Sequence, residues 1–353
     1  MNDNRSNDKV RARFRGTLLG GAVGDALGYA VEFSSEESIF SRFGERGVTE
    51  YVPDPQSGLA LISDDTQMTL FTCHGILRSV KTGEPIRRAV ALAYADWLNT
   101  QMTDAPVEEP ATSLMNYREL YDWRAPGNTC LSAMSARRGQ INAGLLPESF
   151  LNDRLNNSKG CGGVMRAAPI GLLRDMPMEA IELEAAEISA VTHGHPLGYL
   201  PSAMLAHIVH RAVYNDGSLT LKHIVCESIA AIKEDFKDEA YAPYLAKLIS
   251  LAVELSENDD SDLENVHLLG EGWVGEEALA IAVYCALRHS SDFSAAVIAA
   301  VNHKGDSDST GAVAGNIIGA YLGEDAIGEE WREALELKSL MIATADELFE
   351  ALS

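Results

Sequence analysis

The chain has 353 residues, 46% of them hydrophobic, so it is long enough to bury a sizeable core in one or two domains. Its 52 acidic and 28 basic residues give a net charge of −24, which argues against nucleic-acid and anionic-membrane partners because both need basic surface. The polar N-terminus has no signal-peptide core, no apolar run is long enough to span a membrane, and the five cysteines are scattered singly. These features predict a cytoplasmic protein with reduced thiols.

Residues 1–12 are polar and are expected to form a flexible arm, with one domain over residues 13–353. The next stretch, FRGTLLGGAVGDALGYAVEF, has apolar residues at helical spacing. Each glycine costs about 1 kcal/mol in a helix, so this glycine-rich face implies a closely packed backbone or a nearby ligand. Asp25 and Glu32 lie seven residues apart and are expected on one face, either as satisfied polar core residues or as part of a site.

The segment LISDDTQMTLFTCHGILRSV predicts a second helix that begins near Thr66. Either Ser63 or Asp64 can cap it. Because a cap needs only one of these groups, the remaining oxygen atoms of the SDDT turn, including those of Asp65, are available as ligands.

A glycine-rich segment, NNSKGCGGVMRAAPIGLL, lies in the middle of the chain, before a predicted helix. Such a loop can hold phosphate through backbone N–H groups, although no Walker lysine follows it and no strand of a Rossmann unit precedes it. Further on, His193 and His195 lie two residues apart, without the four-residue spacing of a helical zinc pair. We expect them to order a loop or contact a ligand.

Nearly every remaining periodic segment has helical spacing, including residues 85–100, 178–213, 221–255 and 275–302. No alternating strand and no strand–helix–strand rhythm is found. The sequence therefore predicts a mostly or wholly α-helical protein with a single domain.

The stretch NHKGDSDSTGAVAG places Asp306, Asp308 and Ser309 in one polar turn before a small-residue helix. Carboxylates this close repel one another unless a cation lies between them. With the SDDT turn they form an all-oxygen ligand set, which favours Mg²⁺, Mn²⁺ or Ca²⁺. An EF-hand is excluded because its twelfth position is Ile317. The four carboxylates of the two turns suit two ions about 4 Å apart, held between distant segments.

Five motifs occur in the order GDALGYAVE, SDDTQMTL, KGCGGVMRAAP, THGHP and GDSDSTGAVAGNIIGA. Together they resemble the ADP-ribosylglycohydrolase family, which includes the dinitrogenase reductase-activating glycohydrolases, over residues 14–320. The resemblance implies an all-α orthogonal bundle of many helices with two Mg²⁺ or Mn²⁺ ions in a cleft. It also implies hydrolysis of the N- or O-glycosidic bond between ADP-ribose and a modified protein side chain.

The resemblance assigns roles to individual residues. Glu32 matches an acidic residue on a flexible loop near the scissile bond, and Glu32, Asp65 and Asp306 are the candidate catalytic groups. The residues matching metal ligands are Ser63, Asp64, Asp65, Asp306, Asp308 and Ser309, with serine at two positions where threonine is common. The expected substrate-binding residues are Gly127, Asn128, Gly160, Cys161, Gly162, Gly163, Val164, Met165 and His193. We interpret Cys161 as a packing residue because no base is identifiable beside it.

The sequence leaves the substrate open, and it also leaves two alternative functions. ADP-ribosyl-arginine is the preferred substrate, but ADP-ribosyl-serine, ADP-ribosylated DNA and a small glycoside are alternatives. A second hypothesis is an immunity protein that neutralises an ADP-ribosyltransferase toxin by hydrolysis, direct binding or both. A third is an inactive binding or structural family member, although all the paired carboxylates are present.

Overall fold

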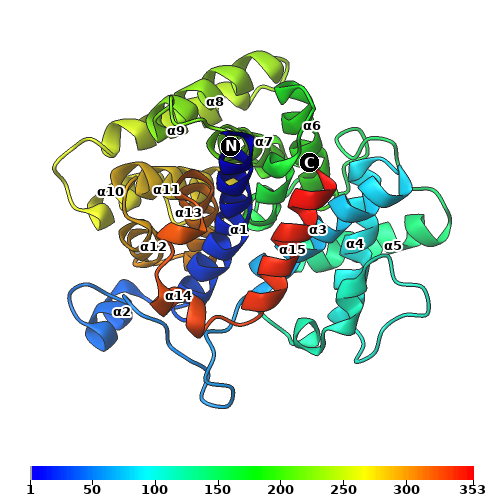
Figure 1. Cartoon of the computed structure of the whole chain (residues 1–353), viewed down its shortest axis with the longest axis horizontal. Helices are drawn as coiled ribbons and strands as arrows, with labels where there is room; N and C mark the ends of the chain where they lie inside the picture. The colour runs from blue at the N-terminus through cyan, green and yellow to red at the C-terminus, as the bar shows by residue number, and fades with distance from the viewer. Residues whose placement is uncertain (1) are drawn as a thin grey trace.

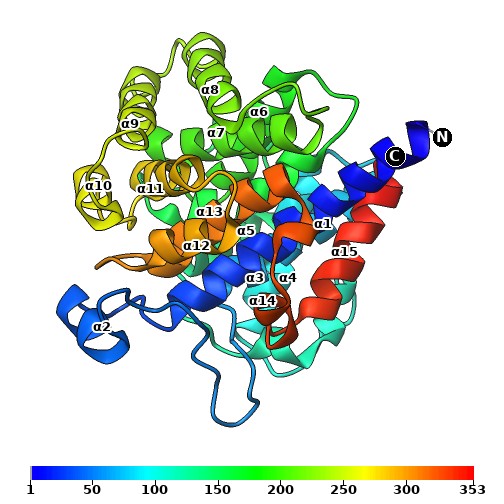
Figure 2. The same ribbon diagram turned by 60° about the vertical axis from the view of Figure 1, so that its left-hand side comes forward.

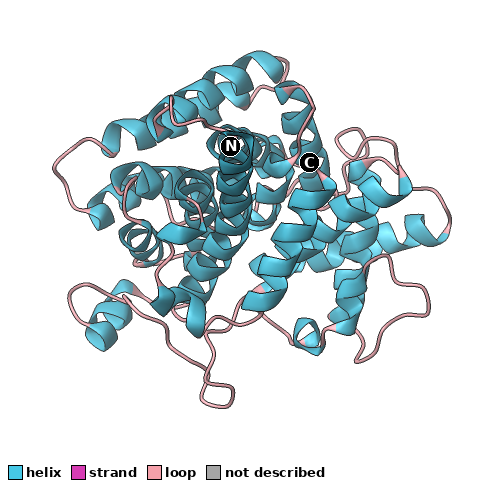
Figure 3. Cartoon of the chain, viewed as in Figure 1, coloured by secondary structure: helices cyan, strands magenta, loops and turns pink. Residues whose placement is uncertain are grey.

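The computed structural model describes residues 2–353, with side chains from Asn7 onward (Figure 1). Over this range every regular element is helical, and the only β pairings are two isolated bridges (Figure 3). The first half of the chain contains α1 Asn2–Tyr29, α2 Glu36–Phe43, α3 Asp64–Thr82, α4 Ile86–Thr100, α5 Asn128–Asn142 and the 3₁₀ helices η1 Ser113–Asn116, η2 Arg118–Tyr121, η3 Cys161–Arg166 and η4 Ala168–Leu172. The predicted all-α class is confirmed.

The second half of the chain is also built of helices, most of them short. They are α6 Met178–Ala190, α7 Pro196–Val213, α8 Leu221–Asp235, α9 Ala242–Leu255, α10 Asp262–Leu269, α11 Gly275–Arg288, α12 Phe293–Val301, α13 Ser307–Leu322, η5 Glu324–Ala326, α14 Glu329–Glu333 and α15 Lys338–Ala351. Within residues 2–353 no helix combines the length and the apolar character needed to cross a membrane.

The N-terminus differs from its expected form. Residues 2–12, predicted as a flexible arm, are helical and form the first part of α1, while Met1 lies outside the described residues. The physical reason is contact with the C-terminal helix α15. Arg11 forms an ion pair with Glu350 and lies over the ring of Phe349, and Arg15 pairs with Asp346. Charged side chains that look solvated in the sequence are thus held by an acidic helix from the other end of the chain (Figure 2).

The centre of the fold is the antiparallel pair formed by α1 and α13, which lie side by side in Figures 1 and 2. Glycines repeat every four residues on both helices and face one another, as in the pair Gly20 and Gly315. A Cβ added to Gly24 would lie 1.9 Å from the carbonyl oxygen of Gly311. The glycines are therefore required for contact between the two backbones, which is one of the two explanations that the sequence left open.

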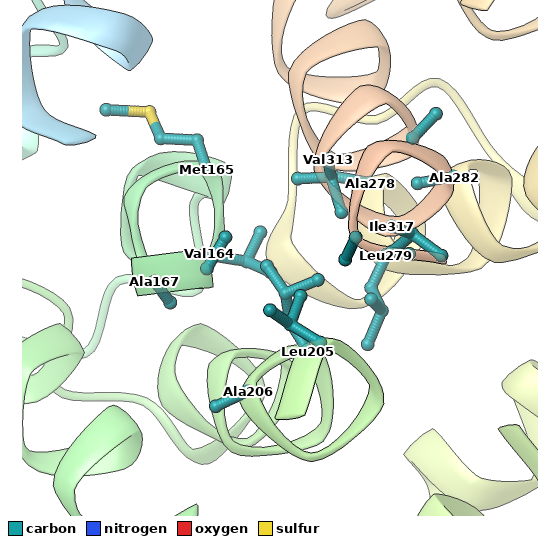
Figure 4. Packing of buried hydrophobic residues seen from close by; sticks show 14 of the residues in the cluster. Val164, Met165, Ala167, Leu205, Ala206, Ala278, Leu279, Ala282, Val313 and Ile317 are labelled. Carbon is teal, nitrogen blue, oxygen red and sulfur yellow. The ribbon is translucent and has the colours of Figure 1, made fainter. Parts of the chain in front are cut away.

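This pairing positions the distant ends of the two helices. Gly28, near the end of α1, lies against the backbone of Ser307 at the start of α13. The turn after α1, which carries Glu32, is therefore fixed beside the acidic turn that begins α13. Between η3, α7 and α13 the core is aliphatic, and Val164, Leu205 and Val313 come together there (Figure 4).

Candidate active site

The SDDT turn and the DSDS turn meet at the buried start of α3 and α13. The hydroxyl of Ser309 donates to Oδ2 of Asp65 over 2.8 Å, across a sequence separation of 244 residues. On the other side, Glu32, Asp306 and Asp308 offer carboxylate oxygens that all lie within 4.8 Å of one another. The two halves of the predicted ligand set thus form one acidic cluster, and Glu32 belongs to it.

The electrostatics of this cluster call for positive charge. Burial, followed by the charge of Asp308, raises the pKa values of Asp64, Asp65 and Asp306 well above the usual carboxyl range. Burial and the neighbouring carboxylates raise the pKa of Glu32 to about 10. One buried oxygen of Glu32, Oε2, has no hydrogen-bond partner. A hard divalent cation fits the carboxylates of the two turns, because their oxygen atoms are hard ligands and its positive charge would offset the repulsion among them.

The SDDT turn is held by a buried network around Asp25, the carboxylate for which the sequence left open a core role or a place in the site. Asp25 accepts hydrogen bonds from the backbone N–H of Ser63 and from both the N–H and hydroxyl of Thr66. Ser63 in turn accepts from the N–H of Asp65 and is the N-cap of α3. Asp25 is therefore a positioning residue, and its use as a backbone acceptor explains why a carboxylate lies in the apolar face of α1.

A buried ion pair supports the same turn from the opposite side. Arg124 donates to Oε1 of Glu336 over 2.7 Å, and Oε2 of Glu336 accepts from the N–H of Ile62. The carbonyl of Arg124 accepts from the N–H of Asp64. No sequence motif marks either charged residue, because the pair is created by packing between segments 212 residues apart.

The loop after Arg124 completes the environment of Asp64. Ala125 has a φ of 54°, a conformation that costs about 1–3 kcal/mol for a residue with a side chain. This turn brings the N–H of Gly127 to 3.2 Å from Oδ2 of Asp64. The strained residue, Ala125, thus lies between the carbonyl of Arg124 and the N–H of Gly127, both of which form hydrogen bonds with Asp64.

The two turns also carry the threonine hydroxyls of Thr66 and Thr310, which the sequence offers as further oxygen ligands, but both are used elsewhere. Thr66 bonds to Asp25, and Thr310 donates to backbone carbonyls, including that of Ala300 at 2.7 Å. The available hydroxyl groups are therefore those of Ser63 and Ser309, although each of these also makes one hydrogen bond.

A cleft of about 320 Å³ opens above the acidic cluster. Most of the predicted site residues line it, and no lysine or arginine is among its lining residues. The predicted residues in the cleft wall are Glu32, Asp64, Asp65, Gly127, Asn128, Gly160, Cys161, Gly162, Met165, His193, Asp306, Asp308 and Ser309.

Three predicted residues lie behind the cleft wall. Ser63 is fully buried as a helix cap, and Gly163 packs against the carbonyl of Gly198. Val164 is a core residue whose side chain meets Leu205, in the opposite direction from Met165 (Figure 4). Gly163 and Val164 therefore do not line the cleft, because this part of η3 packs against α7 and the core, and their role in substrate binding stays a prediction.

The glycine-rich loop offers fewer free N–H groups than its sequence suggests. The N–H of Gly160 donates to Ser158 Oγ over 3.3 Å, and that of Cys161 donates to the carbonyl of Trp273 over 3.3 Å. The thiol of Cys161 lies 2.7 Å from Oδ2 of Asp306, and burial raises its pKa well above the usual value. A protonated thiol that donates to a carboxylate agrees with a packing role and not with a nucleophile.

His193 is oriented by a buried arginine that has no carboxylate partner. Arg166 stacks over the ring of Tyr94 at 4.4 Å, and its Nη2 donates to Oγ1 of Thr192 over 2.6 Å. Oγ1 of Thr192 lies 2.8 Å from Nδ1 of His193. Because arginine only donates, Thr192 accepts from Arg166. The hydroxyl hydrogen of Thr192 has two acceptors in reach, and Nδ1 of His193 at 2.8 Å is closer than the carbonyl of Ser189 at 3.4 Å. The hydrogen of the imidazole then lies on Nε2.

The environment keeps this ring neutral. Burial and the charge of Arg166 lower the pKa of His193 to about 3. Added Cβ atoms at Gly160 and Gly162 would lie 3.3 and 2.8 Å from the ring, so both glycines allow it to approach the loop. His193 lines the cleft. Because Thr192 holds its ring, the neutral imidazole can donate a hydrogen bond from Nε2 to a ligand.

Thr192→Val is expected to weaken binding of ADP-ribose, the ligand that the sequence resemblance implies, by about 10-fold, the effect of one lost hydrogen bond to the ligand. The valine keeps the shape of Thr192 but cannot donate to Nδ1. Calorimetry would measure the affinity, and ¹⁵N-resolved NMR would show whether the imidazole hydrogen leaves Nε2. Thr192→Ser is the matched control and should retain both the tautomer and the affinity. An unchanged His193 tautomer in the valine variant would contradict the orienting role.

Comparisons with known proteins identify the family of this chain. The family profile described as ADP-ribosylglycohydrolase matches residues 6–353. ADP-ribosylhydrolase ARH3 of Mus musculus is 26% identical over 92% of this chain and 88% of its own length. ADP-ribosyl-[dinitrogen reductase] glycohydrolase of Rhodospirillum rubrum is 24% identical, covering 93% and 92% of the two chains.

A solved structure supports the same fold. The protein described as an ADP-ribosylglycohydrolase-related protein complex superposes with a TM-score of 0.67 at 24% identity, covering 98% of this chain and all of its own. The match of the family profile across nearly the whole sequence is the decisive finding. This chain belongs to the ADP-ribosylglycohydrolase family.

Proposed function

We propose that this protein is a metal-dependent hydrolase that removes ADP-ribose from modified arginine side chains of proteins. The observation that carries the proposal is the meeting of two acidic turns, 244 residues apart in sequence, at the base of one cleft. Buried carboxylates without positive partners are costly, so a site of this kind points to a bound cation.

Two Mg²⁺ or Mn²⁺ ions would be held by Asp64, Asp65, Asp306 and Asp308, with help from the hydroxyls of Ser63 and Ser309. All of these donors are hard oxygen atoms. Bound cations supply positive charge, which lowers the pKa of a water molecule and stabilises negative charge in the transition state. The donors lie at the starts of two helices, where Ser63 caps α3 and Asp306 is the residue that precedes α13.

Glu32 is the carboxyl group best placed to hold or move a proton. It lies on the turn after α1 rather than inside a helix, lines the cleft, and keeps one oxygen without a partner. Asp65, in contrast, already accepts from Ser309, and Asp306 accepts from Cys161. Glycosidic cleavage passes through an oxocarbenium-like state, which these neighbouring carboxylates stabilise electrostatically.

The diphosphate of ADP-ribose would meet donor groups rather than basic side chains. Because no lysine or arginine is among the lining residues of the cleft, its negative charges depend on N–H donors and on the cations. His193 Nε2 and the N–H of Gly162 are the candidates in this chain. A site of this composition selects a ligand that arrives with, or binds beside, divalent cations.

The test is ADP-ribose release from proteins linked through arginine, serine or aspartate/glutamate, measured with and without EDTA. We expect release from the arginine-linked protein, loss of activity in EDTA, and recovery when Mg²⁺ or Mn²⁺ is restored. A variant of the exposed acidic loop, Asp259→Asn, controls for general charge effects and should match the wild type. Full activity in EDTA would contradict metal dependence, and release only from serine would contradict the arginine assignment.

A further inference from the structure

A second and larger concavity lies beside the cleft. It is a groove of about 820 Å³ between residues 54–61, residues 117–124 and the start of α15. Its apolar wall is formed by Tyr117 and by Leu59, Leu61, Leu335, Leu337 and Leu340, none of which lines the cleft. Tyr117 is 39% exposed, and Leu59 and Leu61 are only half-buried. An apolar wall left open to solvent indicates a contact with another molecule.

The groove and the cleft share a wall segment. Asp122 and Arg124 line the groove, and the next residues, Ala125 to Asn128, line the cleft. On the loop before α3, Leu61 lines the groove and Asp64 lines the cleft, and three residues span about 11 Å at most. This loop and the start of α15 lie at the end of the molecule where α1 terminates (Figures 1 and 2). A polypeptide with one side chain in the cleft can therefore reach the groove within a few residues.

The segment between the two concavities carries an exposed tryptophan. Trp123 lies between Asp122 of the groove and Ala125 of the cleft, and 63% of its surface is exposed. Tryptophan is enriched in protein interfaces because its ring buries a large area and loses little conformational freedom. Its position indicates that the partner extends from the cleft, over this segment, into the groove.

The charge of the groove indicates the chemistry of the partner. The groove is lined by the carboxylates of Asp54, Glu119, Asp122 and Glu336 and by the basic groups of Arg124 and Lys338. Arg124 is already shared between Asp122 and Glu336, so its charge does not offset that of the exposed Glu119. The groove thus has an excess of negative charge around an apolar wall. A segment with basic and apolar side chains complements both features.

We infer, on the basis of the proposed function, that the groove and Trp123 form a docking surface for the ADP-ribosylated protein. The surface binds a segment of that protein next to the modified side chain, and the segment contains basic and apolar residues. The cleft recognises the modification, which all substrates share. The groove distinguishes one modified protein from another.

The experiment separates docking of the protein from recognition of the modification. Two peptides of equal length carry one ADP-ribosyl-arginine, flanked by lysine and leucine in one and by glutamate and serine in the other, and the third substrate is ADP-ribosyl-arginine itself. Wild type is compared with Trp123→Ser, Leu59→Ser and Glu119→Lys by kcat/KM on each substrate. Leu145→Ser and Glu254→Lys, at exposed positions outside the groove, are the matched controls. Calorimetry gives the Kd of the unmodified lysine–leucine peptide, and thermal melting confirms that each variant is folded.

We expect wild type to prefer the lysine–leucine peptide to both other substrates. Each groove variant should lose about 3- to 10-fold in kcat/KM on that peptide and should bind its unmodified form more weakly, whereas hydrolysis of ADP-ribosyl-arginine should change less than about two-fold. The two control variants should match the wild type on all three substrates.

Three results would overturn the inference. The first is an equal loss on the peptide and on ADP-ribosyl-arginine, which would show that the variants disturb the cleft. The second is a wild type that does not distinguish the two peptides. The third is a wild-type dimer that Leu59→Ser abolishes, which would assign the groove to a second copy of this chain. Binding of the unmodified peptide needs no catalysis, so a wild type that binds it but hydrolyses none of the substrates would contradict the proposed function instead.

Discussion

Asp308→Asn is expected to reduce kcat/KM by on the order of 10²–10³-fold while raising the stability of the metal-free protein. Asp308 is the charge that most affects its neighbours, since it follows burial among the causes that raise the pKa values of Asp25, Glu32, Asp64, Asp65 and Asp306. Asparagine keeps the shape and removes the charge. Repulsion in the folded protein therefore falls, and so does attraction for cations.

These opposite effects separate loss of the site from loss of the fold. Thermal melting in EDTA should show a higher Tm for Asp308→Asn than for wild type. Added Mn²⁺ should raise the Tm of wild type by mass action and raise that of the variant much less. A variant that is both inactive and less stable in EDTA would show that Asp308 supports the fold rather than a cation.

Gly24→Ala is expected to destabilise the protein by at least about 1–3 kcal/mol and to lower activity together with stability. The added Cβ would lie 1.9 Å from the carbonyl oxygen of Gly311 and 2.3 Å from its carbonyl carbon. Both atoms belong to backbone, so no side-chain rotation relieves the overlap. The helices α1 and α13 must separate, and their separation displaces Glu32 from Asp306.

Urea unfolding measures the change in free energy, with Gly139→Ala as the matched control. Gly139 lies on the exposed face of α5, and a Cβ added there meets no atom within 4 Å. Because alanine is the better helix former, the control should be neutral or stabilising by up to about 1 kcal/mol. Gly24→Ala with wild-type stability would contradict the contact between the α1 and α13 backbones.

The glycine spacing on α1 predicted the close approach of either a backbone or a ligand, but it did not identify which of the two or the partner. A row of glycines shows that another group comes close, but it does not say which one. Gly311, Gly315 and Gly319 on α13 have the matching spacing, and this match is recognised only when the two helices are seen side by side. The acidic turns were predictable for a different reason, since crowded carboxylates are conspicuous in any sequence.

The supporting residues could not be predicted in the same way. Arg124, Glu336 and Arg166 are single charged residues in ordinary surroundings, and their burial results from packing between distant segments. The stacking of Phe33 on Trp273 had no signal beyond hydrophobicity, because exposure and stacking are properties of the folded chain. The helical form of residues 2–12 likewise depends on α15, which lies at the other end of the sequence.

The central claim is that the SDDT and DSDS turns bind cations as one site. The direct test is to measure Mn²⁺ binding to wild type, Asp64→Asn and Asp306→Asn by calorimetry or electron paramagnetic resonance. A shared site predicts that either substitution weakens binding at every position detected in wild type. If Asp64→Asn kept one wild-type binding event in full and Asp306→Asn kept the other, the two turns would be independent sites and the claim would be contradicted.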